Sequence, residues 1–357
     1  MASVRQAERR IPLARPITRR GATIAGMGLS IPPRVVTNHD LERLVDTNDE
    51  WVRTRTGIRE RRVAPDGVAT SDLAVEAAQR ALTQARVDAK DVDLIIVGTA
   101  TPDMLFPATA CLVQDRLGAT RAGAFDASAA CSSWAYAAAM GHAAIAAGTA
   151  ETVLVIGAET LSRITDWTDR ATCVLFGDAA AAAVLRPCAL DEGFLAFHLG
   201  SDGSGGSLIC LPAGGSRLPP SAETVAARDH YLKMNGREVY KFAVRAIPRA
   251  IERVAELAGV SVEDVDCFIP HQANLRIIEA AARRLGQPMD RFFVNVERYG
   301  NTSSASVPVA LCEAVEQGRI RPGDLVVFVA VGGGLTWGAA AMRWTGSPGE
   351  TRGGARA

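Results

Sequence analysis

One thiol stands at the head of a long alanine-rich run that carries almost no charge. Cys131 lies in FDASAACSSWAYAAAMGHAAIAAG, where a strand-like segment leads into the cysteine and an apolar helix follows it. The free N–H groups and the positive end of a helix dipole stabilise a thiolate, which would lower the pKa of this thiol and favour a nucleophile. Cysteine also serves as a small buried apolar side chain, and position alone does not decide between the two interpretations.

Two further segments offer polar side chains next to predicted strands and turns. His271 in FIPHQANLRII ends a predicted strand and precedes a helix, and Asn301 lies in ERYGNTSSASVPVAL. A histidine in this position suits hydrogen-bond or acid–base chemistry, although a lone histidine is more often structural. Gly-Asn-Thr is ordinary turn chemistry, so Asn301 alone indicates little. The glycines of VGGGLTWGAAA offer successive backbone amides, which bind an anion or permit close packing.

An internal repeat predicts how these residues are placed. VDAKDVDLIIVGTA (87–100) matches VSVEDVDCFIPHQA (260–273), and a long amphipathic helix is predicted before each. Short apolar runs alternate with helices, which predicts a duplicated α/β unit with a largely parallel sheet in each half. We expect ATIAGMGLSIP to form the first buried strand.

The same repeat brings the polar residues together. Cys131 aligns with Asn301, and His271 follows the strand that matches Leu94–Gly98. Functional groups of open α/β sheets gather at the carboxyl ends of strands. If a pseudo-twofold axis relates the halves, Cys131, His271 and Asn301 share one pocket.

Composition excludes several classes of protein. The chain has 357 residues with 48% apolar content, and its 39 basic residues equal its 39 acidic ones, so no overall positive field attracts nucleic acid or anionic lipid. Seven cysteines without CxxC spacing argue against a disulfide framework or a zinc site and favour a cytoplasmic location. No apolar run is long enough to span a membrane. Residues 1–20 are expected to form a flexible basic extension, and residues 346–357 a disordered tail.

Six segments in order carry a resemblance to a known family. They are TNDEWVRTRTGIRERR (47–62), the Cys131 segment, GDAAAAAVL (177–185), PHQANLRII (270–278), GNTSSASVP (300–308) and GGGLTWG (332–338). Together they resemble β-ketoacyl-acyl-carrier-protein synthase III over about residues 21 to 345. The resemblance implies an α/β, thiolase-like fold, in which two duplicated halves (21–190 and 191–345) form five layers, α-β-α-β-α. It also implies a homodimer.

The resemblance further implies a decarboxylating Claisen condensation that initiates fatty acid synthesis. Cys131 would attack a short acyl-CoA, while the backbone N–H groups of Cys131 and Gly333 hold the oxyanion. Malonyl-acyl carrier protein would then enter, and His271 and Asn301 would donate hydrogen bonds to its thioester carbonyl as CO2 departs. Neither a metal nor a redox cofactor is implied.

Binding residues also carry over from the resemblance. Trp51 and Arg170 resemble the pair that sandwiches the CoA adenine by stacking and cation–π contact. Phe106 is expected to reach across the dimer interface and to close the partner's acyl pocket, which would limit the starter acyl group to short chains. The other expected binding residues are Thr47, Arg55 and Asn274 for CoA, Trp134 for the acyl pocket, and Lys241, Arg276, Arg283 and Arg284 for docking an acidic carrier protein.

Some residues depart from the family pattern and keep alternatives open. Ser132, Ser133 and Trp134 follow the cysteine where smaller, less polar residues and then Phe are common, and Tyr299 stands where His is frequent. A specialised relative that primes a polyketide pathway or transfers an acyl group to an alcohol or amine therefore remains an alternative. From other classes, a cysteine hydrolase would use the same Cys–His pair, and a noncatalytic scaffold would use neither residue.

Overall fold

The computed structural model describes residues 20–346, and the expected extension (1–19) and tail (347–357) lie outside this range. Arg20, the last residue of the expected extension, is held against the folded chain. Its Nε donates to the Ile145 carbonyl at 3.0 Å, and its Nη1 lies 2.7 Å from the Glu151 carboxylate. Across residues 20–346, no helix combines the length and the apolar character that crossing a membrane requires.

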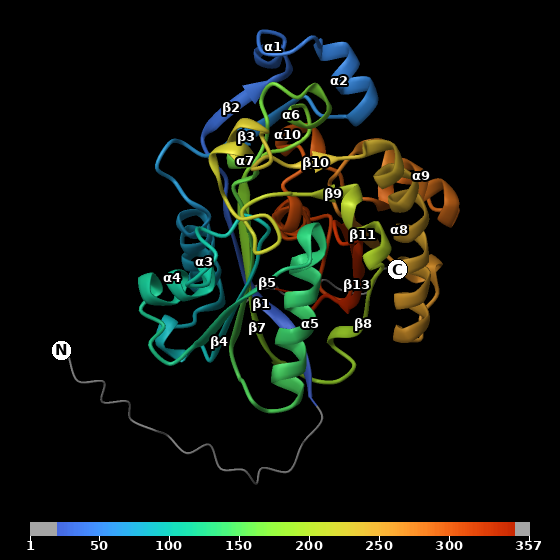
Figure 1. Ribbon diagram of the computed structural model, residues 1–357. Coiled ribbons are helices and arrows are strands. Elements are labelled where there is room, and N and C mark those ends of the chain that lie inside the picture. The colour runs from blue at the N-terminus through green and yellow to red at the C-terminus, as the bar shows by residue number, and fades with distance from the viewer. Residues whose placement is uncertain (1–19, 347–357) are drawn as a thin grey trace, which may run out of the picture.

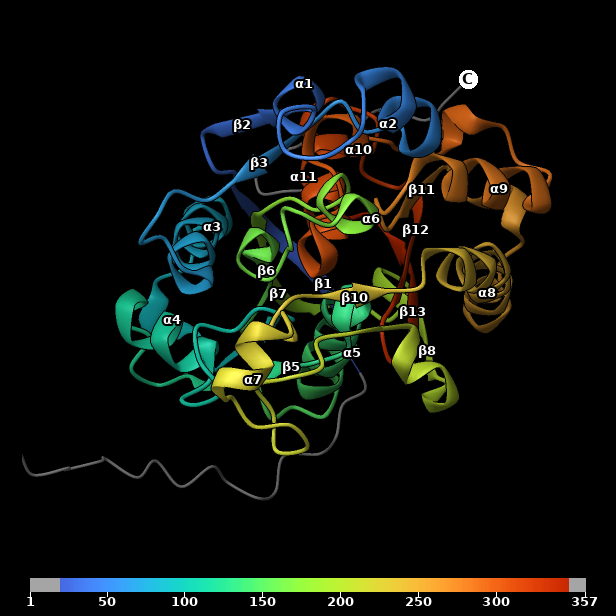
Figure 2. The ribbon, with the colours of Figure 1, turned by 45° about the horizontal axis from the view of Figure 1, so that its top comes forward.

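Five layers of helices and sheets make up the molecule (Figures 1 and 2). Apolar side chains of each central strand alternate between two cores, so that Val153 and Val155 face the middle layer while Leu154 and Ile156 face outward. This alternation sandwiches two helices between the sheets and confirms the predicted α-β-α-β-α arrangement. The outer helices are α3 (Thr70–Ala85) and α4 (Thr109–Leu117) on one side and α8 (Gly236–Ala258) and α9 (Leu275–Leu285) on the other, and the central helices are α5 (Ser133–Ala146) and α11 (Ser306–Glu316).

Both sheets are mixed, and the prediction of largely parallel sheets is wrong. Strand β4 pairs in parallel with β5 and β6, and β11 pairs in parallel with β12, but every other pairing within the two sheets is antiparallel. Apolar runs indicate burial on both faces but not strand direction. The first sheet has the order β1 (Gly21–Ser30), β7 (Ala179–Cys188), β6 (Val153–Glu159), β4 (Leu94–Gly98), β5 (Gly123–Ala127), and the second β11 (Cys267–Pro270), β12 (Leu325–Gly332), β13 (Thr336–Arg343), β8 (Gly193–Ser201).

The two halves repeat one topology. The series β4-β6-β7-β1 has the same neighbours and directions as β11-β12-β13-β8, and only the first half adds a full fifth strand, β5. In the second half an isolated bridge between Phe268 and Phe292 takes the place of β5. The predicted first strand is confirmed as β1.

The match between the halves differs by three residues from the sequence-based alignment. Ala130 (φ 46°) and Ser303 (φ 48°) occupy the same left-handed conformation, and α5 and α11 each begin three residues later. Cys131 therefore matches Ser304 and not Asn301. The repeated serines of the two segments do not reveal where each helix begins.

Small elements gather at one end of the layers, at the top of Figure 1. The hairpin strands β2 (Arg34–Thr37) and β3 (Glu60–Val63) lie beside α1 (Asn38–Leu41) and α2 (Asp49–Thr56). The remaining elements are α6 (Arg170–Cys173), α7 (Ala222–Ala226), β9 (Ile209–Cys210), β10 (Lys233–Met234) and α10 (Val296–Tyr299). Several of these elements contribute residues to the walls of the cavity described next.

Candidate active site

Cys131, His271 and Asn301 line the same cavity, which has a volume of about 220 Å³. The cysteine comes from the first half of the chain, and the histidine and asparagine come from the second. Most of the other lining residues are apolar; they include Leu175, Ile209, Val239, Phe242, Ala243 and Val331, with Gly332 and Gly333 beside the cysteine. The structure thus joins three polar groups from separate segments in one largely apolar chamber.

Cys131 lies in the tight turn Ala130–Ser132, between β5 and α5. Burial raises the pKa of its thiol to about 12, although a hydrogen bond from the Ser303 side chain acts in the opposite direction. The expectation of a lowered pKa is therefore wrong for the resting protein, because loss of hydration outweighs the helix dipole. At neutral pH the thiol of the ligand-free protein is therefore protonated.

His271 is buried, and both its backbone N–H and its ring take part in hydrogen bonds. Its backbone N–H donates to the Val329 carbonyl at 2.7 Å, and its Nδ1 atom lies 2.5 Å from the Ser306 hydroxyl oxygen. Burial lowers the pKa of the imidazole to about 4, so the ring is neutral at physiological pH. A neutral ring of this kind is suited to donate a hydrogen bond without carrying a charge.

Asn301 is fixed through its backbone and through its side-chain oxygen. Its N–H donates to the Leu175 carbonyl at 2.8 Å, and its Oδ1 accepts the Ser303 N–H at 2.8 Å. Gly300 has φ 64°, and a Cβ there would lie 2.6 Å from the Leu175 carbonyl oxygen, so only glycine fits. With Oδ1 occupied, the Nδ2 amino group is the part of Asn301 that can serve a ligand as a donor.

The predicted glycine loop is the hairpin turn between β12 and β13, and it packs against the cysteine turn. A Cβ on Gly332 would lie 2.6 Å from the Cys131 nitrogen, which shows how closely the two backbones approach. The Thr336 hydroxyl oxygen lies 2.8 Å from the Ala129 carbonyl and 3.1 Å from that of Gly333, and so ties the loop to the turn. The amide groups of Cys131 and Gly333 consequently belong to the same corner of the cavity.

The residues expected to bind CoA lie near one another, outside the chamber except for Asn274. Trp51 on α2 and Arg170 on α6 stack, with the guanidinium carbon 4.1 Å from the ring centre. The Asn274 side chain caps α9 and donates to the Arg55 carbonyl at 3.1 Å, which connects α2 to the second half. The hydroxyl oxygen of Thr47 is buried and has no hydrogen-bond partner among residues 20–346.

The two residues expected to shape the acyl pocket are separated. Phe106 is 84% exposed, whereas Trp134 is 1% exposed and packs edge-on against Phe328 in the middle layer at 5.8 Å. Neither is among the residues that line the 220 Å³ cavity. The four basic residues expected to dock a carrier protein are all exposed, Lys241 on α8 and Arg276, Arg283 and Arg284 on α9.

Among the buried charged residues that the sequence reasoning missed, Glu159 and Arg61 hold segments around the site. Glu159, at the end of β6, accepts hydrogen bonds from the Thr101 hydroxyl at 2.6 Å and the Ala100 N–H at 3.1 Å, and the Ser304 hydroxyl lies 2.8 Å away. Burial raises its pKa. Its carboxylate thus braces the second-half turn beneath the cavity. A charge directly after the apolar run VLVIGA was the available signal.

Arg61 is the second such residue, and its side chain is fully buried. Its guanidinium donates to the Val174 carbonyl at 2.9 Å and to the Asn38 side chain at 3.0 Å, and Asn38 in turn donates to Asp49 at 2.9 Å. Val174 directly follows α6 as its C-cap residue and Asp49 begins α2, so Arg61 links the helices that carry Arg170 and Trp51. Nothing in the run RERR distinguishes the buried Arg61 from the exposed Arg59 and the half-buried Arg62.

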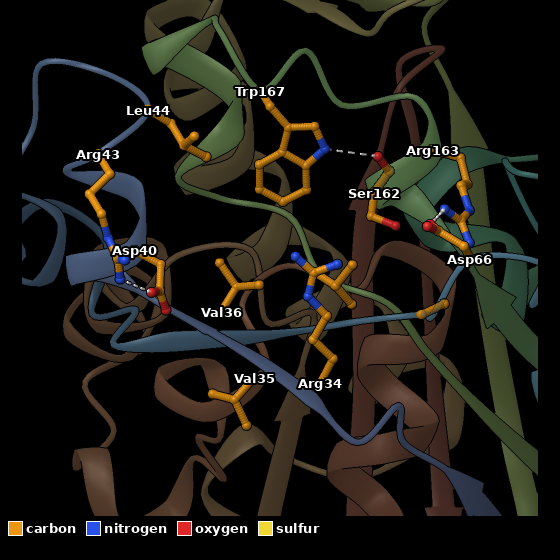
Figure 3. A pocket seen from close by; sticks show the side chains of 12 residues that line it. Arg34, Val35, Val36, Asp40, Arg43, Leu44, Asp66, Ser162, Arg163 and Trp167 are labelled. Carbon is orange, nitrogen blue, oxygen red and sulfur yellow. Dashed lines mark hydrogen bonds and ion pairs between the residues drawn. The ribbon is translucent and has the colours of Figure 1, made fainter.

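A larger hollow lies away from these groups, between the β2–β3 hairpin and the segment that carries Trp167 (Figure 3). Its volume is about 640 Å³, and its rim carries the ion pairs Arg43–Asp40 and Arg163–Asp66. None of Cys131, His271 or Asn301 lines it. Size therefore does not identify the chemical site in this molecule, whereas the convergence of polar groups does.

Comparisons with known proteins identify the family of the chain. One family model, for 3-oxoacyl-(acyl-carrier-protein) synthase III, matches residues 125–203. A second model, for the C-terminal part of the same family, matches residues 255–344. The beta-ketoacyl-(acyl-carrier-protein) synthase III of Symbiobacterium thermophilum is 57% identical over 90% of this chain and 97% of its own length, and that of Desulfitobacterium hafniense is 52% identical over 90% and 97%.

Solved structures show the same fold. The synthase III of Thermus thermophilus superposes with a TM-score of 0.84 at 50% identity, covering 91% of this chain and all (100%) of that one. The priming β-ketosynthase of the R1128 polyketide pathway superposes with a TM-score of 0.87 at 35% identity, covering 94% and 100%. The chain belongs to the 3-oxoacyl-(acyl-carrier-protein) synthase III family, the condensing acyltransferases that initiate fatty acid synthesis.

Proposed function

We propose that this chain condenses a short acyl-CoA with malonyl-acyl carrier protein through an acyl-cysteine intermediate on Cys131. The observation that carries the proposal is the convergence of Cys131, His271, Asn301 and the Gly332–Gly333 loop on one apolar cavity. Each group matches one need of the reaction: a nucleophile, two hydrogen-bond donors and a pair of backbone amides. The reaction consists of thioester exchange and decarboxylation, and it needs no metal or redox cofactor.

The first half-reaction transfers the acyl group to sulfur. Cys131 Sγ attacks the thioester carbonyl carbon, the amides of Cys131 and Gly333 stabilise the oxyanion, and the carbon–sulfur bond to CoA breaks. Because the resting thiol is protonated, its proton leaves with the CoA sulfur, and the products are acyl-cysteine and CoA thiol. The apolar walls exclude water, which protects the acyl-cysteine from hydrolysis.

The second half-reaction forms the new carbon–carbon bond. His271 and Asn301 donate hydrogen bonds to the thioester carbonyl of the malonyl group, and the electron pair released as CO2 departs moves onto that oxygen as an enolate. The enolate carbon then attacks the acyl-cysteine carbonyl. The bond to Cys131 Sγ breaks and leaves a thiolate, which takes up one proton from solvent, and β-ketoacyl-acyl carrier protein is released.

The approach of the two substrates uses the surface above the cavity. We assign CoA to the path marked by Thr47, Trp51, Arg55, Arg170 and Asn274, where an adenine ring would separate the stacked Trp51–Arg170 pair. The exposed Lys241, Arg276, Arg283 and Arg284 would meet the acidic carrier protein on α8 and α9, two elements that flank the cavity.

We further propose that two copies of the chain pair through the β5 edge. Within residues 20–346, β5 pairs with β4 alone, and Leu105 and Phe106 nearby are 81% and 84% exposed. An unpaired strand edge with exposed apolar side chains is suited to association with a second copy. In such a dimer Phe106 would close the partner's acyl pocket. We assign the halves to residues 21–190 and 191–345, and place the enzyme in the cytoplasm, where its seven free cysteines persist.

Incubation with radiolabelled acetyl-CoA followed by denaturation tests the proposal. The wild type should carry a stable thioester label, Cys131→Ala should carry none, and Cys210→Ala, which removes another thiol next to the lining residue Ile209, should retain the label. Rapid release of free acetate would identify a hydrolase, and an unlabelled wild type would identify a scaffold. A panel of acyl-CoA starters with malonyl-acyl carrier protein then tests the preference for short chains.

A further inference from the structure

The Ser306 hydroxyl group holds the His271 ring. The distance between Ser306 Oγ and His271 Nδ1 is 2.5 Å, and the two residues are 1% and 2% exposed. Ser306 is the first residue of α11, and His271 directly follows β11. Water cannot readily replace this contact, because both partners are buried.

The direction of this hydrogen bond follows from the other contact of the serine. The Gln272 N–H donates to Ser306 Oγ at 3.4 Å, so the hydroxyl oxygen already accepts a hydrogen bond. A hydroxyl group has one proton to donate, and among residues 20–346 Ser306 Oγ has no hydrogen-bond acceptor other than His271 Nδ1. A buried hydroxyl proton without an acceptor is costly. The serine therefore donates to Nδ1.

We infer that Ser306 is a positioning residue that holds His271 in the tautomer with its proton on Nε2. An Nδ1 atom that accepts a hydrogen bond carries no proton of its own, so a neutral ring has its proton on the other nitrogen. Burial keeps the ring neutral, since it lowers the pKa of His271 to about 4. Nδ1 faces Ser306, and Nε2 is left to serve the cavity that His271 lines.

With this tautomer His271 takes part in only one of the two half-reactions, the decarboxylation. This consequence rests on the proposed function. An Nε2–H group donates to the malonyl thioester carbonyl, as the decarboxylation requires. The same group has no lone pair with which to accept the Cys131 proton, so His271 does not serve as the base during acylation. Loss of the serine hydroxyl should therefore impair decarboxylation and spare self-acylation.

Nitrogen NMR of the full chain labelled with ¹⁵N-histidine tests the inference directly, because the two tautomers differ in their nitrogen chemical shifts. The His271 signals are assigned by their loss in His271→Gln. The wild type and Ser306→Thr should show the proton on Nε2, and Ser306→Ala should show a mixture. The matched control Ser133→Ala, which removes the serine at the corresponding position of the first half, should leave the His271 signals unchanged.

Kinetics provide a second readout. In Ser306→Ala, malonyl-acyl carrier protein decarboxylation should fall about tenfold, as with other outer partners of functional histidines, while acetyl labelling of Cys131 proceeds at the wild-type rate. A wild-type His271 with its proton on Nδ1 overturns the inference, as does a Ser306→Ala enzyme with wild-type tautomer and decarboxylation. If Ser306→Ala fails to fold, the wild-type spectrum decides alone. Failure of the proposed function would appear separately, as an unlabelled wild type.

Discussion

The two central helices begin at turns with the same backbone but different side-chain contacts. At the start of α5, the Ser133 hydroxyl accepts the Ala129 N–H at 2.8 Å and lies 2.7 Å from the Ala130 carbonyl, so its contacts stay within the preceding turn. At the start of α11, the corresponding Ser306 hydroxyl contacts His271 instead. One turn is therefore complete in itself and presents a thiol, whereas the other organises groups from neighbouring elements.

This difference shows how the two copies of a duplicated unit can serve different steps of a two-step reaction. In the proposed mechanism the first-half turn needs only sulfur and backbone amides, and its tight internal bonding keeps these in place. The second half must orient a ring and a side-chain amide toward a carbonyl, which requires contacts beyond the turn. The same fold geometry thus supports a nucleophile on one side and a pair of donors on the other.

The largest effect is expected from removing the first-half chemistry. Cys131→Ala should abolish acyl-enzyme formation and lower condensation by at least about 10⁴-fold, because no other group can carry the acyl intermediate. Mass spectrometry of the intact protein after incubation with acetyl-CoA measures the intermediate. Condensation from acyl-CoA near the wild-type rate would contradict the assignment, and Cys210→Ala serves as the control.

Removing the second-half donors should separate the two steps. His271→Ala or Asn301→Ala should lower decarboxylation of malonyl-acyl carrier protein by roughly 10²–10³-fold, since each variant loses one donor to the enolate oxygen. Self-acylation should remain close to that of the wild type. Measurement of CO2 release and of acyl labelling in parallel tests this separation. Loss of labelling in both variants, with CO2 release retained, would reverse the roles of the halves.

The buried His271 should also make the second half sensitive to acid. Its pKa is lowered from 6.5 to about 4, so the folded protein binds fewer protons than the unfolded chain between these values. Its contribution to stability is therefore full above 6.5 and is lost as the pH falls toward about 4, a change of a few kcal/mol.

Urea unfolding across this pH range measures the effect. The free energy of unfolding should decline less steeply in His271→Gln than in the wild type. The matched control is His39→Gln, because His39 is an exposed histidine. Equal slopes for the wild type and His271→Gln would show that the ring is not held neutral by burial.

A smaller effect, on the preference for acyl chain length, is expected from replacing Phe106 near the β5 edge. Phe106→Thr should shift the ratio of kcat/KM values toward longer acyl-CoA starters by about tenfold, because removing the ring relieves an overpacking penalty of roughly 1–3 kcal/mol. Assays with acetyl-, butyryl-, octanoyl- and dodecanoyl-CoA measure the ratios. A wild type that already prefers dodecanoyl-CoA, or unchanged ratios, would place the end of the acyl pocket elsewhere.

The smallest effect is expected at the nucleotide path. Trp51→Ala should raise KM for acyl-CoA by about fivefold, since an aromatic contact to a base or cation contributes on the order of 1 kcal/mol at an exposed site. Condensation kcat should change little. Trp167→Ala, at the separate hollow of Figure 3, provides an aromatic control that should leave KM for acyl-CoA unchanged.

Much of the architecture could be predicted from the order of motifs along the chain. The strand before His271 and the run after Cys131 are continuous in sequence, so their periodicity and flanking residues were sufficient to predict them. Strand direction was not predictable, because the alanine-rich β7 and the β13 run suit either direction when both faces are buried.

The pKa values and hydrogen-bond partners of the site residues also could not be predicted from the sequence. The pKa of Cys131 depends on burial by both halves, and the partner of His271 Nδ1 lies 35 residues away. Glu159 contacts Ser304 across 145 residues. These contacts depend on tertiary packing and leave no local pattern in the sequence. A strand end or a glycine turn, by contrast, does leave such a pattern.

The protonated state of the resting Cys131 thiol has a consequence for the resistance of the enzyme to oxidation. Peroxides convert thiolates to sulfenic acids and react slowly with protonated thiols. A pKa near 12 therefore keeps Cys131 in the form that oxidants attack least, and the small apolar chamber further limits their access. Burial of the nucleophile thus keeps the ligand-free enzyme in its less oxidisable form between turnovers.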